Sequence, residues 1–213
     1  CITVTGLAST MINGIVAIAG DAVIIGLILT MLCCIVLGMG VPTTANYCIM
    51  ASTCAPILIQ LGIPAVAAHF FVFYFGIVAD ITPPVALAAY AGSAIARSNP
   101  MKTAVNATKL AIAAFIVPYI LAFNPVMILE GDVTVISVAV IVITSLVGLF
   151  GVSAGLNGHL FKKIPMVLRV VIIAAGICMM IPEVYSDIIG LVVVGGIFML
   201  QYFMMKKQRV AQA

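Results

Sequence analysis

The sequence predicts an all-α, polytopic integral membrane protein. Of its 213 residues, 65% are hydrophobic and only 7% are charged, and the mean hydropathy is +1.36. A soluble domain is about half apolar and roughly a quarter charged, so it could not cover its core with so few charges. Residues 22–79 contain no charged side chain at all. This composition excludes a soluble enzyme, a nucleic-acid-binding protein and a disordered chain, and the expected surroundings are the lipid bilayer.

Residues 1–20 are predicted to be the end of a preceding apolar span followed by a mildly amphipathic arm. The first residue is Cys1, and no segment with a basic start and a small-residue cleavage site opens the chain. We therefore interpret the sequence as the C-terminal portion of a longer protein.

Residues 21–62 form a predicted re-entrant hairpin. They contain two apolar runs, 22–39 and 43–60. The tip between the runs includes Gly38, Gly40 and Pro42 and carries no charge. A loop in water on either side of a membrane normally carries charge, so we expect this tip to lie within the protein. Two uninterrupted crossings remain the alternative.

Residues 63–97 are predicted to be one transmembrane helix with a break in its middle. The apolar halves, 65–79 and 83–96, are each too short to cross a hydrocarbon core of about 30 Å. The break falls at Asp80-Ile81-Thr82-Pro83-Pro84. Proline lacks the backbone N–H that would continue a helix, but it fits the first turn of a new one.

Four ordinary spans are expected after the broken helix. Their apolar runs are about 106–123, 132–150, 165–182 and 186–205. We therefore predict one transmembrane helix within residues 98–125, three within 126–205, and a cytoplasmic basic tail at 206–213.

The charged residues separate onto two sides of this arrangement. All nine basic residues fall on one face when the hairpin enters and leaves the membrane on the same side. The acidic residues on the other face are Asp21, Glu130, Asp132, Glu183 and Asp187. The positive-inside rule makes the basic face, and with it the C-terminus, cytoplasmic. Two full crossings in place of the hairpin would give the same assignment, so the charges set the orientation without proving re-entry.

The two predicted breaks supply the polar groups of a candidate binding site. New half-helices would begin near Pro42 and Pro83, and their N-terminal N–H groups attract an anion. The preceding halves end near Gly40 and Ala79, where unpaired carbonyl oxygens suit a small cation such as Na⁺. Asp80 could neutralise that ion, take up a proton or cap the next half-helix, and these roles are compatible. Discontinuous helices of this kind are typical of the binding sites of secondary transporters.

Two motifs resemble those of a known transporter family. The segment Gly38-Met39-Gly40-Val41-Pro42-Thr43-Thr44-Ala45-Asn46-Tyr47 resembles a signature of the TAXI-type tripartite ATP-independent periplasmic (TRAP) transporters. The segments 68–76 and 79–86 resemble the block that follows it in that family. The resemblance is dense over residues 20–97, about a third of the chain.

The resemblance implies a large membrane subunit of elevator type that is built from two inverted repeats, of which this chain holds one. It places a sodium site between the hairpin tip and the broken helix, formed by Gly38, Gly40, Thr43, Asn46, Asp80 and Thr82. An organic anion would be bound beside it by Thr43, Thr44, Asn46, Thr82 and Pro83. Na⁺ would be the coupling ion, and no cofactor is expected.

The same resemblance implies partners and a location. A periplasmic substrate-binding protein would deliver small organic acids, such as C4-dicarboxylates, to a permease in the cytoplasmic (inner) membrane of a bacterium or archaeon. The first repeat and the small-subunit helices are not in this sequence, and we expect them in a fused upstream part. The spans from residue 132 onward resemble the C-terminal extension of fused TAXI members, with a role in scaffolding or lipid contact.

Other functions stay open at this point. The chain could belong to a sodium–carboxylate symporter that needs no binding protein, or it could be a non-transporting membrane scaffold subunit. No nucleophile–base pair and no metal-ligand spacing is present, so no enzymatic activity and no metal other than sodium is predicted. We interpret His69 as an interfacial or packing residue and the six cysteines, none in a CxxC pair, as packing residues.

Overall fold

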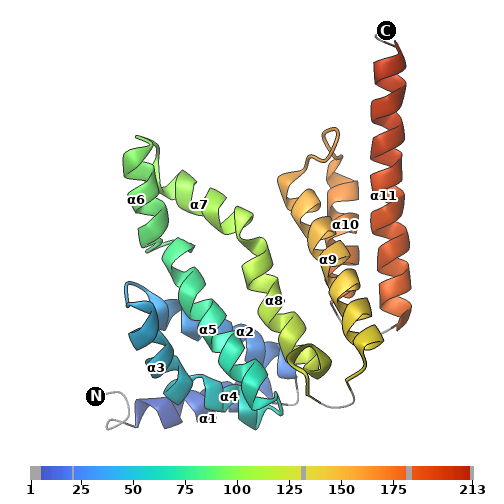
Figure 1. Ribbon diagram of the computed structural model, residues 1–213. Helices are drawn as coiled ribbons and strands as arrows, with labels where there is room; N and C mark the ends of the chain where they lie inside the picture. The colour runs from blue at the N-terminus through green and yellow to red at the C-terminus, as the bar shows by residue number, and fades with distance from the viewer. Residues whose placement is uncertain (1–5, 21, 131–132, 181–183, 212–213) are drawn as a thin grey trace. The chain divides into compact units, whose positions relative to one another are not determined.

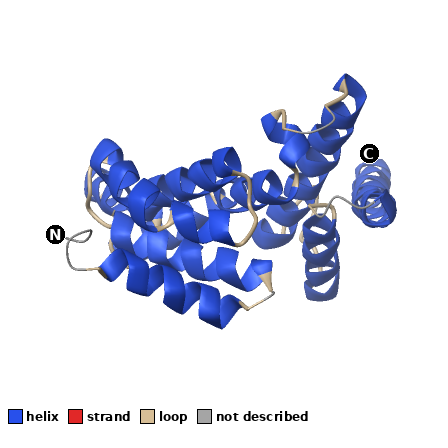
Figure 2. Cartoon of the chain, turned by 90° about the horizontal axis from the view of Figure 1, so that it is seen from below, coloured by secondary structure: helices blue, strands red, loops and turns tan. Residues whose placement is uncertain are grey.

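The computed structural model describes residues 6–20, 22–130, 133–180 and 184–211, and its regular structure there is all helical (Figure 2). The described ranges contain no strand, so the predicted all-α class is confirmed for them. The chain divides into two compact units, Cys1–Ile128 and Leu129–Ala213. Each unit is described by itself.

The first unit contains the hairpin and the broken helix (Figure 1). Its helices are α1 (Leu7–Ala19), α2 (Val23–Gly38), α3 (Thr43–Thr53), α4 (Ala55–Gln60), α5 (Ala65–Val78), the 3₁₀ helix η1 (Ala79–Ile81), α6 (Leu87–Ile95), α7 (Pro100–Leu110), α8 (Ile112–Phe123) and the 3₁₀ helix η2 (Pro125–Ile128).

Helix α5 is the centre of this unit. It contacts α2, α3, α4 and α8, and in Figure 1 it passes between α3 and α8. The rings of Phe71 and Phe75 are fully buried, and their centroids lie 4.7 Å apart. The ring of Tyr119 in α8 lies 5.2 Å from that of Phe71. Such aromatic pairs add about 0.5–1.5 kcal/mol to the burial of their apolar surface, so α5 is held firmly and can position the break that follows it.

The arms of the hairpin are shorter or more polar than a crossing helix. The first arm, α2, has 16 residues and is therefore about 24 Å long at 1.5 Å per residue. The second arm is divided at Cys54 into α3 and α4. Neither arm is among the three helices of the described residues that are long and apolar enough to cross a membrane. The re-entrant path of the hairpin through the membrane stays a prediction.

The break in the second predicted element is present, but the helix after it begins later than expected. Helix α5 ends at Val78 and continues as η1 to Ile81, whereas α6 begins only at Leu87. Thr82 and Pro83 each precede a proline, and a residue in that position is disfavoured from the helical region. The chain therefore makes a turn, closed by a 3.1 Å bond from the Ala86 N–H to the Thr82 carbonyl, before helical geometry resumes.

The span predicted at 106–123 begins earlier in the structure. Asn99 caps α7 by accepting a 3.0 Å bond from the Lys102 N–H, and Pro100 occupies the first turn. A joint at Ala111 separates α7 from α8. Together the two helices form a 24-residue run, Pro100–Phe123, that is long and apolar enough to span a membrane.

The second unit is a group of three helices, α9 (Val135–Asn157), α10 (Met166–Cys178) and α11 (Val184–Ala211), among its described residues. Glycines let these helices approach closely. A Cβ added at Gly148 would lie 2.8 Å from the Gly176 carbonyl oxygen, and one added at Gly190 would lie 2.1 Å from the Cγ of Met179. Helices α9 and α11 are long enough to cross a membrane, but α10 has only 13 residues and is shorter than the predicted run 165–182.

Parts of the sequence-based predictions fall outside the described residues. These are the first residues of the predicted arm (1–5), the last of the basic tail (212–213), and the acidic residues Asp21, Asp132 and Glu183 of the charge argument.

Candidate functional site

The hairpin tip is a tight turn between α2 and α3. Gly40 has φ 73°, a left-handed conformation that glycine adopts without strain. Pro42 then precedes the first helical residue, Thr43, and its carbonyl accepts a 2.9 Å bond from the Asn46 N–H. A half-helix therefore begins directly after Pro42, as predicted.

The end of α5 is closed by side chains rather than by a continuing helix. The Thr82 hydroxyl donates a 2.6 Å hydrogen bond to the Val78 carbonyl. The Thr108 hydroxyl of α7 donates a 3.1 Å bond to the Ile81 carbonyl. Two carbonyls freed by the break are thus satisfied within the protein, as a break at membrane depth requires.

The hairpin and the broken helix meet at Asn46 and Gly76. The Asn46 side-chain amide donates a 3.0 Å bond to the Gly76 carbonyl, and Asn46 is only 2% exposed. A Cβ added at Gly38 would lie 2.9 Å from Asn46 Nδ2, 3.0 Å from Ala79 Cβ and 3.0 Å from the Gly76 oxygen. The last turn of α2 therefore packs directly on Asn46 and on the end of α5, which only a residue without a side chain allows.

The other polar atom of Asn46 is available to a ligand. Its Oδ1 is buried and has no hydrogen-bond partner among the described residues. The bond from Nδ2 to a carbonyl fixes which end of the amide is which, because only the NH₂ group can donate. A buried amide oxygen without a donor costs about 1–3 kcal/mol. A neutral oxygen of this kind is a ligand that a hard cation such as Na⁺ accepts.

The remaining predicted site residues lie around this contact with different exposures. Gly38 and Asn46 are buried. Asp80, Thr82 and Pro83 are half-buried in the break. The exposed ones are Gly40, Thr43 and Thr44, the two threonines standing on the first turn of α3. The structure thus joins Gly38 and Asn46 to the end of α5 and leaves the first turn of α3 open.

Two residues of this site were not predicted from the sequence. Gly76 supplies the carbonyl for Asn46, and Thr108 comes from a helix 27 residues beyond its partner Ile81. The small residue Gly76 within an aromatic run is a signal of close packing that could have pointed to it. Nothing in the local sequence distinguishes Thr108 from other helical threonines.

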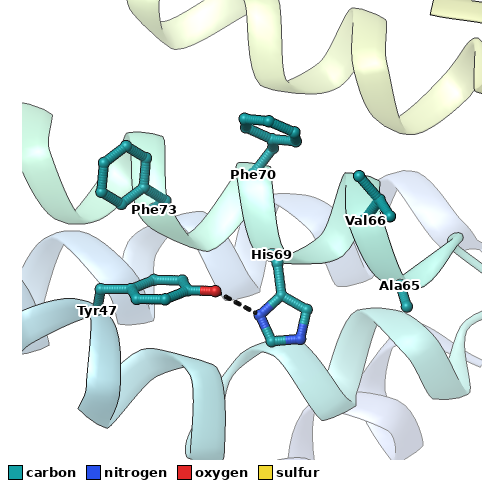
Figure 3. A pocket seen from close by; sticks show the side chains of 6 residues that line it. All are labelled: Tyr47, Ala65, Val66, His69, Phe70 and Phe73. Atoms are coloured by element: carbon teal, nitrogen blue, oxygen red, sulfur yellow. Dashed lines mark hydrogen bonds between the residues drawn. The ribbon is translucent and has the colours of Figure 1, made fainter. Parts of the chain in front are cut away.

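An apolar pocket lies on another side of the contact between α3 and α5 (Figure 3). It has a volume of about 440 Å³ and is lined by Tyr47, Ala65, Val66, His69, Phe70 and Phe73. The Tyr47 hydroxyl and His69 Nδ1 are 3.0 Å apart and hydrogen-bonded across the two helices. His69 therefore joins hairpin to broken helix, in keeping with the packing role predicted for it.

The described residues offer a cation few charged or thiol ligands. No group of three or more His, Cys, Asp or Glu residues there could hold a metal ion. The described cysteines, which are Cys33, Cys34, Cys48, Cys54 and Cys178, are all free thiols. Any cation at the contact between hairpin and broken helix would therefore be held by amide, hydroxyl and carbonyl oxygens and at most one carboxylate.

Comparison with protein-family models gives one informative result. The model described as "Tripartite ATP-independent periplasmic transporter, DctM component" matches residues 1–136, which include the hairpin, the broken helix and α8. Comparisons with curated proteins and with solved structures give no match.

Proposed function

Because the chain belongs to the DctM family of tripartite ATP-independent periplasmic transporters, we propose that it lines the path by which a sodium gradient drives uptake of a small organic acid. DctM proteins are membrane components of transporters rather than enzymes. The chain is accordingly part of a multi-pass membrane protein, and its apolar helices agree with this. The coupling ion, the substrate class and the route of delivery are our proposals.

The observation that carries the sodium proposal is the buried Oδ1 of Asn46. It lies where α2 and α5 end. The backbone carbonyls at these two helix ends therefore belong to residues at or next to the same contact. A cation there would gain one amide oxygen that otherwise has no donor and would be attracted by the negative ends of two helix dipoles. Asp80, two residues beyond Val78 in η1, would supply the charge that balances the ion.

The exposed first turn of α3 supports an anionic substrate. Its N–H groups carry the positive end of the helix dipole, and the hydroxyls of Thr43 and Thr44 stand on the same turn. A carboxylate bound there would lie beside the proposed cation, so each would favour the binding of the other. Asn46, Thr82 and Pro83 would border the same space, and small organic acids such as C4-dicarboxylates fit this chemistry.

The remaining assignments follow the same family relationship. We propose that the full transporter is of the TAXI type, that a periplasmic binding protein delivers the substrate, and that an upstream part of the protein supplies the other repeat and the small-subunit helices. The location would be a bacterial or archaeal cytoplasmic membrane with the C-terminus in the cytoplasm. An elevator movement of the hairpin and the broken helix would carry the substrate.

The test is the substitution Asn46→Ala in the complete transporter reconstituted in liposomes. We expect the sodium concentration for half-maximal uptake to rise about tenfold or more, because the charge-assisted interaction lost is worth roughly 1.5–3 kcal/mol. The purified variant should also lose the rise in melting temperature that NaCl gives relative to KCl at equal ionic strength. Cys48→Ala, on the exposed side of the same helix α3, is the matched control and should change neither measurement.

An unchanged sodium response in Asn46→Ala would remove this residue from the ion site and the proposal with it. Uptake by the membrane component without any periplasmic protein would instead favour a sodium–carboxylate symporter. If neither the parent protein nor the variant takes up any organic acid with sodium, the scaffold alternative gains support.

A further inference from the structure

The second unit contains a group of three cationic side chains that are not part of the proposed transport site. Two of them, Lys162 and Lys163, lie in the loop between α9 and α10, and a third, Lys206, lies near the end of α11. Lys163 and Lys206 are exposed, and Lys162 is half-buried. We call these three lysines, with the aromatic residues Phe161, Phe198 and Tyr202 between them, the basic end.

Aromatic contacts bring the loop and the last helix together. The ring of Phe161 lies 5.3 Å from that of Phe198 and 6.1 Å from that of Tyr202, between centroids. Phe198, Tyr202 and Lys206 follow one another at intervals of four residues, so they lie along the same side of α11. Lys206 therefore stands one helical turn beyond the ring that Phe161 touches, on the side of the helix that faces the loop.

The loop itself has a fixed shape. Gly158 ends α9 in the left-handed conformation with φ 67°, and its carbonyl accepts a 2.9 Å bond from the Ile164 N–H. Arg169 of α10 donates hydrogen bonds of 2.8 Å and 2.9 Å to the carbonyls of Gly155 and Leu156. Its guanidinium is thus used to close the end of α9, which leaves Lys162 and Lys163 as the cations that the loop offers to a ligand.

The acidic side chains among the described residues of this unit lie away from the basic end. Glu130 precedes α9, and Asp187 lies in the first turn of α11, so both belong to the opposite end of these helices. A tyrosine followed by a lysine one turn later, as at Tyr202 and Lys206, is typical of the place where a membrane-spanning helix leaves the hydrocarbon region. Apolar side chains of α11 next to the basic end, including Met199 and Phe203, are exposed on the surface of the helix.

We propose that the basic end is a binding site for the headgroup of an anionic phospholipid. The phosphate would lie between Lys162 or Lys163 and Lys206, and the acyl chains would run along the exposed apolar side of α11. Charge complementarity and the aromatic contacts at the membrane surface favour a lipid over a soluble anion, because a soluble anion would make no use of the apolar surface. This proposal does not depend on transport, since nearly all of the unit lies beyond the residues 1–136 that match the family model.

The test uses the absence of tryptophan from these 213 residues, and any tryptophan elsewhere in the reconstituted protein is first replaced by phenylalanine. The substitution Phe161→Trp places a fluorophore at the site, and the variant is reconstituted in phosphatidylcholine vesicles with increasing fractions of brominated phosphatidylglycerol or brominated phosphatidylcholine. Lysines near a membrane surface contribute about 1 kcal/mol each, so we expect the anionic lipid to be preferred about tenfold or more. Lys162→Gln with Lys163→Gln should reduce that preference to about fivefold or less, which is what Lys206 alone would give.

The matched control is Lys102→Gln with Lys109→Gln, which removes the same charge from α7. This variant should keep the preference, and an equal loss in both double variants would overturn the proposal, because it would show a general effect of net charge. Equal quenching by the two brominated lipids would also overturn it. Protection of the fluorophore by millimolar inorganic phosphate would identify a site for a free anion rather than for a lipid. If the ligand were an acidic protein segment, the quenching would not depend on the lipid headgroup and would change only when that segment is added. This result would also overturn the proposal.

Discussion

At the scale of single residues, the contact between the hairpin and the broken helix depends on two glycines around one amide. A Cβ added at Gly38 would lie 2.9 Å from Asn46 Nδ2, and one added at Gly76 would lie 3.1 Å from the same atom, so both glycines pack tightly against this side chain. The amide donates a hydrogen bond to the Gly76 carbonyl, and its oxygen has no hydrogen-bond partner among the described residues. A larger residue at either glycine would displace Asn46 and separate the two elements.

The change Gly38→Ala tests this directly. Its new Cβ would lie 2.9–3.0 Å from Asn46 Nδ2, Ala79 Cβ and the Gly76 carbonyl oxygen, two of which belong to the firmly held end of α5. Overpacking of this kind costs about 1–3 kcal/mol, so the melting temperature of the purified protein in detergent should fall and the sodium-dependent part of uptake should weaken.

Gly92→Ala in α6 is the control for that measurement. A Cβ at Gly92 meets nothing within 4 Å, so alanine should leave the protein unchanged or stabilise it by about 0.5–1 kcal/mol through its higher helix propensity. Equal effects of the two substitutions would show that the close approach at Gly38 is unimportant.

At the scale of helices, the sequence predicted where the chain breaks better than where helices resume. Pro42 and Pro83 mark the breaks because they remove donors, and both breaks are in the structure. The start of α6 at Leu87 depends on how a turn of several residues closes, which the two prolines do not determine by themselves. The end of α10 at Cys178 and the joint at Ala111 likewise fall inside apolar runs, so hydropathy does not mark them.

In the candidate site, too, some residues could be predicted from the sequence but their contacts could not. Asn46 and the glycine tip could be named from the sequence, because a polar segment with two glycines and a proline, residues 38–46, interrupts two apolar runs. Which residues bond to one another could not be predicted. The bonds Asn46–Gly76, Tyr47–His69 and Thr108–Ile81 depend on the register between helices, and they join residues 22 to 30 positions apart in the sequence. Hydropathy contains no information about that register.

The association of α9 and α10 also rests on glycines, and it gives a prediction at this scale. A Cβ at Gly176 would lie 2.6 Å from the Gly148 carbonyl oxygen and 2.9 Å from Val152 Cγ2, so Gly176→Ala must push the helices apart. Small residues drive such packing in membranes, and we expect a loss of at least about 1–3 kcal/mol, measured as a lower unfolding midpoint of the purified protein. In α11, Gly196→Ala meets nothing within 4 Å and should cause no loss. A midpoint that falls equally in both variants would mean that the loss does not come from the contact between Gly176 and Gly148, because alanine favours a helix more than glycine does.

At the scale of the whole molecule, the distribution of charge predicts an orientation in the membrane. The basic residues Lys102 and Lys163 would lie in the cytoplasm, whereas Glu130 would lie outside. The hairpin adds a second requirement, because residue 43 would be reached by water from one side only and would be covered when sodium or substrate binds. An arrangement with two full crossings would place residue 43 in an ordinary loop.

Labelling of single cysteines in a variant without the native thiols tests both requirements together. With a membrane-impermeant maleimide added to intact cells, Glu130→Cys should react at once, whereas Lys102→Cys and Lys163→Cys should react only after the membrane is opened. Thr43→Cys should react from one side, and sodium should slow that reaction because the exposed first turn of α3 adjoins the proposed ion site. Labelling of Lys163→Cys in intact cells would reverse the orientation. Reaction at residue 43 that is fast and indifferent to sodium would mean that the tip is a solvent loop, and the hairpin would then have no part in binding.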